Sequence, residues 1–424
     1  MAVFAHKDCH PKRSAAKSKD LRLFPAQPTS LMCCALCALL ALTGCRKQDF
    51  PQYPPDYREY AYVTNSGSGT VTVLDVVNVR LDRELPVGQN PVAVAASPTR
   101  NEVYVVNSGA AGGEGSISVI NAENNTVAAT IALHRRAVSI DLDAGGKLAY
   151  VANAGSNSIS VVDLEKRREA AQIGAGEEPV AARLSADGKT LAVANRGGNS
   201  VSVFDAASMR VRAVFPGCPG ASDVVILPDS SKAFASCSAG HQVMVIALAR
   251  ASQPASGQTA AVAAEPDRLE ALMDVGRGPV ELALKPDGGE VFVVNALSDS
   301  ISEVITGTDD VQGAYMMGDD PVSGLVSRDN SLLFVGNLHS QNVIVYSIDD
   351  GRRLTYFHVG DGPSAMAFSA AGNLLFVVDT RSGDVAVART ADVAASRESS
   401  SPLFTFLPAG RAPNAIVDKA YKVQ

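Results

Sequence analysis

The sequence predicts an all-β chain that folds as a β-propeller of about eight four-stranded blades, with seven blades as the alternative. Three observations support this prediction. A segment of constant length recurs about every 42 residues, its central strand is apolar on both faces, and the C-terminus supplies a strand that the first repeat lacks. Repeats of this length, with four short strands each, are typical of propeller blades.

The repeat begins near Tyr60 and consists of windows of equal length without gaps, such as PVAVAASPTRNEVYVVN at 91–107. Most steps between windows are about 42 residues long. The two longer steps contain the insertions 110–114 and 249–268, which we interpret as surface loops. The windows end at Asn65, Asn107, Asn153, Asn195, Cys237, Asn295, Asn337 and Asp379.

Each repeat contains four strand-like segments separated by turns. The turn after the first segment carries Asp-Gly at 187–188 and 287–288, residues that tolerate the backbone of a tight hairpin. In the second segment an aromatic residue such as Tyr104 stands between apolar neighbours, here Val103 and Val105. Because successive strand residues point to opposite faces, adjacent blades must cover both faces of this strand.

The two ends of the chain predict closure of the ring. The first repeat, EYAYVTN ending at Asn65, lacks the strand that precedes this segment elsewhere, and residues 413–424 supply such a strand. A C-terminal strand that completes the first blade gives eight blades, and it leaves no blade with an uncovered face. The alternative is a seven-bladed ring with one irregular unit.

Composition narrows the function. Gly 35 and Pro 22 indicate many turns rather than long helices, and the absence of Trp leaves the core to Val, Ala, Leu and Ile. The formal net charge is −7, and the basic residues near the N-terminus make the rest of the chain more acidic still. A surface that binds a phosphate backbone needs the opposite sign, so we expect no nucleic-acid partner.

Residues 1–44 are typical of a lipoprotein signal peptide. Basic residues up to Arg22 precede an apolar run at 31–42, which is too short to span a bilayer and ends in Leu-Thr-Gly-Cys. This ending resembles a lipobox, which implies that Cys45 is the lipidated first residue of the mature protein; the alternative is a plain signal peptide. Arg46 follows instead of aspartate, which in the sorting rule of such lipoproteins favours the outer membrane.

The expected domain organisation follows from this ending. Residues 45–58 form a Pro-rich tether, and residues 59–424 form the propeller. We expect an exported protein that a lipid anchor holds at the periplasmic face of the cell envelope.

The repeat resembles the YVTN-type β-propeller family. Residues 62–65 read YVTN, and YVVN, YVAN and FVVN recur in later repeats, so the resemblance covers almost everything from Tyr60 to the C-terminus. The family includes archaeal surface-layer proteins, secreted bacterial proteins and relatives described as lactonases. The resemblance therefore implies the propeller fold and does not select one function.

No complete catalytic or cofactor motif is present, and we expect no cofactor. The sequence Gly-Lys-Thr at 188–190 resembles the end of a phosphate loop, but Arg183 stands where that loop needs glycine. Cys34 and Cys37 have CxxC spacing but lie in the predicted signal peptide. Histidines predicted at one end of the propeller, in different blades, leave a haem or copper site as an alternative. They are His134, His241, His339 and His358.

The candidate site is the ring of residue pairs that directly precede the first strand of each blade. If that strand lines a central channel, these pairs surround one mouth of it. Their charges form patches of both signs, which can bind a small polar ligand, a metal through the acidic arc, or a partner protein; the alternative is a solvated ring without a ligand. We assign no metal. The charged members are Arg135, Arg136, Glu177, Glu178, Arg277, Asp319, Asp320, Asp361 and Arg411.

The two cysteines that follow Cys45 are predicted to form a disulfide. Cys218 lies three residues before a first strand, and Cys237 ends the hairpin that begins there. A hairpin brings its ends together, so the Cα atoms fall within the roughly 4.4–6.8 Å that a disulfide needs, and the exported compartment is oxidising. The alternative is two thiols that miss each other by a few ångströms.

These features favour a non-catalytic binding or scaffolding propeller, with an unknown protein or a small polar ligand at the channel mouth. A lactonase-like hydrolase is the alternative implied by the family resemblance, although no residues can be assigned as base and electrophile. A redox propeller with haem or copper is the third class.

Overall fold

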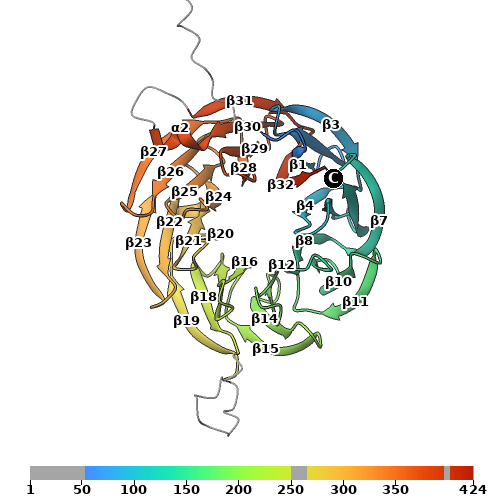
Figure 1. Ribbon diagram of the computed structural model, residues 1–424. Helices are drawn as coiled ribbons and strands as arrows, with labels where there is room; N and C mark the ends of the chain where they lie inside the picture. The colour runs from blue at the N-terminus through green and yellow to red at the C-terminus, as the bar shows by residue number, and fades with distance from the viewer. Residues whose placement is uncertain (1–52, 250–264, 396–401, 424) are drawn as a thin grey trace, which may run out of the picture. The chain divides into compact units, whose positions relative to one another are not determined.

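The computed structural model is a β-propeller of eight blades, which confirms the larger of the two predicted numbers (Figure 1). The structure describes residues 53–249, 265–395 and 402–423. Each blade is a four-stranded antiparallel sheet whose strands follow one another from the centre outward in the order of the predicted segments. Helix within the described ranges is limited to the 3-10 turn η1 (Ala296–Ser298) and the short α2 (Thr390–Ala395).

The innermost two strands of each blade contain the constant window of the repeat. The innermost strands surround the centre of the ring in Figure 1 and are β32 (Pro413–Lys422), β4 (Pro91–Ala96), β8 (Ala137–Leu142), β12 (Pro179–Leu184), β16 (Ala221–Ile226), β20 (Pro279–Leu284), β24 (Pro321–Val326) and β28 (Pro363–Phe368). The second strands are β1 (Tyr57–Asn65), β5 (Glu102–Asn107), β9 (Leu148–Asn153), β13 (Thr190–Asn195), β17 (Lys232–Cys237), β21 (Glu290–Asn295), β25 (Leu332–Asn337) and β29 (Leu374–Asp379).

The outer half of each blade consists of the third and fourth strands. The third strands are β2 (Thr70–Asp75), β6 (Glu114–Asn121), β10 (Ser158–Asp163), β14 (Ser200–Asp205), β18 (Gln242–Ala247), β22 (Ser300–Ile305), β26 (Asn342–Ser347) and β30 (Asp384–Arg389). The fourth strands are β3 (Arg80–Pro86), β7 (Thr126–Arg135), β11 (Arg168–Gly174), β15 (Arg210–Pro216), β19 (Arg268–Asp274), β23 (Asp310–Met316), β27 (Arg352–His358) and β31 (Leu403–Pro408). We number the blades 1 to 8 from the blade of β1 onward.

The second strand is the core of every blade, as its two apolar faces predict. Tyr104 of β5 packs with Val151 of the next blade in one buried cluster, while its neighbours Val103 and Val105 pack with Tyr62 of the preceding blade. All five side chains have no exposed surface. A blade removed from the ring would expose both faces, so the blades depend on one another for stability.

The C-terminal strand closes the ring, as predicted. Strand β32 pairs antiparallel with β1, from Tyr57 opposite Lys422 to Asn65 opposite Pro413. It also contacts β4 and β28, the innermost strands of the two neighbouring blades. Blade 1 is therefore assembled from both ends of the chain.

Two strand boundaries differ from the sequence predictions, and some predicted segments lie outside the described residues. Strand β1 begins at Tyr57, two residues inside the predicted tether 45–58. Strand β19 begins at Arg268, the last residue of the predicted insertion 249–268. The signal peptide 1–44, Cys45, most of the tether and residues 250–264 lie outside the described residues. Helix α2, between β30 and β31, was not predicted.

None of the helices found in the described ranges is long and apolar enough to span a membrane.

Candidate functional site at one mouth of the propeller

The centre of the ring is open to solvent. In β4 and β8 every residue after the first is partly exposed, although these strands are the innermost of their blades. The innermost strands thus border a central channel, as the sequence interpretation assumed.

All eight predicted residue pairs lie at the same mouth of this channel. In every blade the two carbonyl groups of the pair accept hydrogen bonds from amides of the turn between the second and third strands. In blade 4, for example, Arg196 N donates to Glu178 O over 2.9 Å and Gly198 N donates to Glu177 O over 3.0 Å. We call these eight pairs the rim. Their backbone is held alike in all blades, while their side chains differ.

The second residue of every rim pair has a left-handed backbone, with φ between 50° and 74°. Glycine adopts this conformation freely, but a residue with a Cβ atom pays about 1–2 kcal/mol. Three blades have glycine at this position, whereas Arg136, Glu178 and Ala412 carry the cost. Charged side chains on strained backbone are typical of functional positions.

Two of the predicted residues form an ion pair between neighbouring blades. Arg136 Nη2 of blade 3 lies 2.8 Å from Glu178 Oε1 of blade 4, and their side chains are 52% and 29% exposed. Because the pair is partly exposed, its contribution to stability is small. The pair joins the rims of blades 3 and 4.

The acidic arc of the rim has partners of its own. His339 Nδ1 lies 3.0 Å from Asp320 Oδ2, and His339 Nε2 lies 3.1 Å from Arg381 Nη2. Arg381 in turn lies 3.6 Å from Asp361 Oδ1. A cation, Arg381, therefore already lies in the arc that we considered for a metal, and no group of three or more metal-ligating side chains occurs within the described ranges.

The other charged rim residues have side chains without a hydrogen bond or ion pair to any described residue. All of them are exposed. They are available to a ligand or partner, and they are Arg135, Glu177, Arg277, Asp319 and Arg411.

The four histidines lie apart and have different neighbours. His134 contacts Glu169, and the ring of His358 packs against Tyr356. His241 Nδ1 accepts the amide of Gly278 over 3.2 Å. His339 and His358 both belong to blade 7, so the prediction that all four lie in different blades was wrong.

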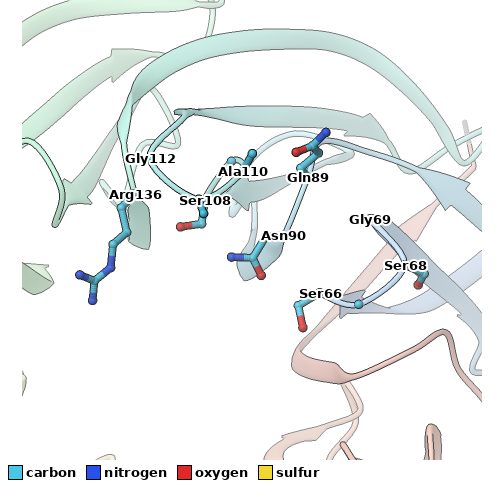
Figure 2. A pocket seen from close by; sticks show the side chains of 12 residues that line it. Ser66, Ser68, Gly69, Gln89, Asn90, Ser108, Ala110, Gly112 and Arg136 are labelled. Atoms are coloured by element: carbon cyan, nitrogen blue, oxygen red, sulfur yellow. The ribbon is translucent and has the colours of Figure 1, made fainter.

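A pocket of about 670 Å³ opens on the rim at blades 1 to 3 (Figure 2). Its walls are the turn 66–69 of blade 1, the rim pair Gln89–Asn90, the turn 108–112 of blade 2, and Arg136. The turn 108–112 contains most of the insertion 110–114 that the repeat analysis identified. Arg136 is the only charged residue in this lining.

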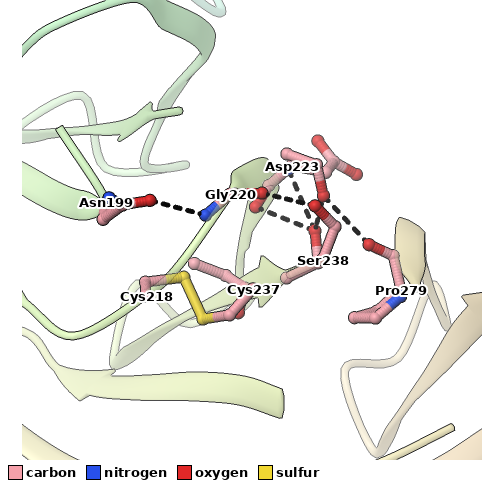
Figure 3. Close-up of a disulfide and its surroundings, with 10 residues drawn as sticks. Asn199, Cys218, Gly220, Asp223, Cys237, Ser238 and Pro279 are labelled. Atoms are coloured by element: carbon pink, nitrogen blue, oxygen red, sulfur yellow. Dashed lines mark hydrogen bonds between the residues drawn. A yellow bond between two sulfur atoms is a disulfide. The ribbon is translucent and has the colours of Figure 1, made fainter. Parts of the chain in front are cut away.

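A disulfide joins Cys218 and Cys237 behind the rim of blade 5 (Figure 3). The Cα atoms are 4.7 Å apart. In six other blades these two positions hold a glycine and an Asn or Asp in close contact; a Cβ atom on Gly88, for example, would lie 2.6 Å from Asn107 Cγ. The disulfide therefore replaces a packed Gly–Asn contact of the repeat.

Charged residues on the innermost strands form a second cluster that the sequence interpretation missed. Arg183 Nη2 of β12 lies 3.7 Å from Asp223 Oδ1 of β16. Asp141 Oδ2 of β8 accepts the amide of Leu184 over 2.7 Å. Glu281 of β20 lies in the next blade, close enough to Asp223 for the two charges to interact. The signal was present in the sequence, because each charge interrupts an otherwise apolar strand.

The cluster perturbs the ionisation of its carboxyl groups. Burial, and secondarily the negative charge of Asp223, raise the pKa of Glu281 from 4.5 to about 8. Burial also raises the pKa values of Asp141 and Asp223, while the Arg183 guanidinium opposes both shifts. Glu281 is packed among protein atoms and yet partly exposed to the channel. It therefore holds a proton near neutral pH in contact with the solvent.

We expect the Glu281→Gln variant to gain stability over the wild type as pH rises. The folded state binds the Glu281 proton more tightly than the unfolded state, so the wild-type free energy of unfolding falls between about pH 4.5 and 8. The glutamine side chain of the variant cannot ionise and escapes this loss. Denaturant unfolding at pH 5 and pH 9 measures the difference, with Glu177→Gln on the exposed rim as the control. Equal differences at both pH values would contradict the prediction.

The fold and the rim define a class of protein, an eight-bladed propeller with a polar site at one channel mouth. No protein-family model matches the chain, and none of the curated proteins is detectably similar to it. Many solved structures share its fold.

Three of these structures show how different the proteins with this fold are. AztD from Citrobacter koseri, solved in its apo form, is 13% identical with a TM-score of 0.60, covering 86% of this chain and 98% of that one. A putative 6-phosphogluconolactonase from Bacteroides uniformis is 13% identical with a TM-score of 0.56, covering 86% and 100%. Hydrazine synthase from Kuenenia stuttgartiensis is 20% identical with a TM-score of 0.54, covering 71% and 96%. Likeness at these identities shows the fold alone.

Proposed function

We propose that this chain is a binding propeller of the cell envelope, and that it binds a small polar ligand at the rim without a catalytic step. The observation that carries the proposal is the pair Arg136 and Glu178. Both occupy left-handed positions where three other blades have glycine, and their partly exposed ion pair returns little stability. A ligand that needs these charges explains why charged residues occupy positions with strained backbone.

The double variant Arg136→Gly, Glu178→Gly tests this proposal. We expect it to melt at or above the wild-type temperature, because glycine relieves about 1 kcal/mol of backbone strain at each position. We also expect it to lose small molecules that copurify with the wild type. The measurement is mass spectrometry of the metabolites released when each purified protein is denatured.

Two outcomes would contradict the proposal. One is a wild type with no enriched small molecule. The other is a double variant that loses stability and keeps the same ligand, because the ion pair would then be structural.

The envelope location is part of the proposal and rests on the ending Leu-Thr-Gly-Cys at 42–45. We expect Cys45→Ser to abolish incorporation of radiolabelled palmitate and to release the protein from membranes. The variant lacks the thiol of Cys45, so it cannot carry the acyl chains that anchor the protein. Fractionation of cells that express the wild type and the variant checks this. A variant that stays on membranes through detergent-free washing would overturn the anchor.

Membership of the YVTN-type repeat family is also a proposal. It is supported by the repeated YVTN, YVVN and YVAN sequences, which lie at the end of the buried second strands.

Hydrolysis is the second candidate function, and Glu281 favours it. A carboxyl group with a pKa of about 8 can exchange a proton near neutral pH. Two of the similar structures are called putative 6-phosphogluconolactonases. Hydrolysis of a sugar lactone by the wild type, lost in Glu281→Gln but kept in the rim double variant, would favour the enzyme over the binding propeller.

A further inference from the structure

Side chains cap the amide groups of the rim in most blades. The first amide of a pair donates to a serine in the turn of the same blade, as Arg277 N does to Ser298 Oγ over 2.9 Å. In four blades the second amide of the pair donates to the residue directly before the third strand of the preceding blade. Asn157 caps Glu178 over 2.9 Å in this way, and Asn199 caps Gly220 over 2.8 Å (Figure 3).

Blade 2 lacks both caps. Gly69 stands where Asn157 and Asn199 stand in later blades and has no side chain to offer. Ala110, in the inserted turn, stands 21 residues after Gln89, the spacing at which Ser298 follows Arg277. In each of the other seven rim pairs, at least one amide has an acceptor, and at Pro219 the first residue has no N–H group. Gln89–Asn90 is the one pair of the eight in which both N–H groups are present and neither has an acceptor among the described residues.

Gln89 and Asn90, the residues with the uncapped amides, line the pocket of Figure 2. Gly69 and Ala110, the two positions from which caps would come, both line this pocket. The pocket thus occupies the space that capping side chains fill in other blades. Asn90 has a left-handed φ of 51°, and successive amides in such a turn form a concave arrangement that binds anions.

The charges and hydrogen-bond donors of the other pocket residues are those that an anion requires. Its lining has no carboxylate, and Arg136 is about half exposed with a single ion-pair partner. Arg411 of the rim adjoins the pocket, since its carbonyl lies 3.1 Å from the place of a Cβ atom on Gly67. The side chains of Gln89, Asn90 and Ser108 form no hydrogen bond with described residues and are free to donate.

We propose that this pocket binds an oxyanion group, a phosphate or a carboxylate carried by a small polar molecule. The amides of Gln89 and Asn90 hold its oxygen atoms, and Arg136 neutralises its charge. The inference rests on the proposed function, because it gives the chemical class of the ligand at the rim.

The variant Gly69→Asn tests the inference by restoring a cap. Asparagine fits there, because Asn157 and Asn199 hold the same left-handed conformation in their own blades and the nearest atom to a new Cβ is 3.5 Å away. The matched control is Gly383→Asn, at the equivalent position of blade 8, where a new Cβ has 3.4 Å of clearance.

The measurement is calorimetric titration of the purified full chain with inorganic phosphate, and with acetate, against chloride at equal ionic strength. We expect saturable binding that Gly69→Asn weakens at least tenfold and Gly383→Asn leaves within about twofold. Loss of a charged hydrogen bond in Arg136→Gln should weaken it roughly tenfold or more. Tighter binding of phosphate or of acetate tells which oxyanion the ligand carries.

Three results would overturn the inference: no binding of either anion, unchanged binding in Gly69→Asn, or equal loss in Gly383→Asn. If a neutral or cationic ligand copurifies with the wild type while neither anion binds, this inference fails and the proposed function stands. If no ligand copurifies and neither anion binds, both fail.

Discussion

A chain that ends at Ala412 is expected to aggregate or to melt far below the wild-type temperature. It lacks β32, so the free edge of β1 would be exposed along its whole length. The partly buried side chains of Ile416, Val417 and Tyr421 would no longer pack against the buried clusters at the seam, and each loses a part of the roughly 1.5–3 kcal/mol that full burial of an apolar side chain contributes. Together with the unpaired edge of β1, this loss is a large part of the roughly 5–15 kcal/mol by which an ordinary protein is stable.

Polar contacts of β32 add to this loss. Lys419 Nζ donates to Ser97 O of blade 2 over 2.7 Å, and Thr380 Oγ1 of blade 8 donates to Pro413 O over 2.6 Å. Circular dichroism and thermal melting of the truncated chain measure the effect. A chain that lacks only its last two residues is the control, since these follow β32. A protein truncated after Ala412 that melts like the wild type would refute closure by this strand.

The second large effect is expected from the disulfide. Mass spectrometry of the alkylated, non-reduced protein should find Cys218 and Cys237 linked. Cys218→Ser with Cys237→Ser should lower the free energy of unfolding by about 3 kcal/mol, because the bond closes a loop with a sequence separation of 19 residues. The melting temperature should fall by several degrees. A reducing agent should produce a similar shift in the wild type and none in the variant.

The glycine and asparagine of other blades provide a matched variant. Cys218→Gly with Cys237→Asn removes the bond and installs the contact found at Gly88 and Asn107. We expect partial recovery, because Met244 stands where blade 2 has Ser118, which accepts a hydrogen bond from Asn107. Two alkylated thiols in the mature wild type, or full stability of the serine variant, would contradict a stabilising bond.

The fold was predictable because the same residues must solve the same packing problem in every blade. An aromatic residue with apolar neighbours, as in Tyr104 and Phe292, is buried on both faces only between blades. Helix α2 was missed because it occurs in one blade, where no repeat supports it. The insertion 110–114 was predicted as a loop from spacing, and the structure shortens that loop by one residue, because Glu114 begins β6. Spacing could not show that the loop forms a pocket wall.

The candidate site was predictable in position more than in chemistry. Register placed the rim pairs at one mouth, but it could not show that Arg381 enters the acidic arc or that Arg136 pairs with Glu178. The channel cluster joins residues at different heights of adjacent strands, such as Arg183 and Asp223, so equal register did not bring them together. The uncapped pair Gln89–Asn90 becomes visible only when the caps of other blades are known.

Closure by β32 also determines the order in which the protein is completed. Synthesis and export both proceed from the N-terminus, so β1 is available for folding before β32, and blade 1 remains a three-stranded sheet until almost the whole chain has followed. Blades 2 to 8 consist of consecutive segments and need not wait. During this interval β1 offers an open edge that the β32 of another molecule fits equally well. Crowded synthesis therefore favours strand exchange between copies, and dilute conditions favour the closed monomeric ring.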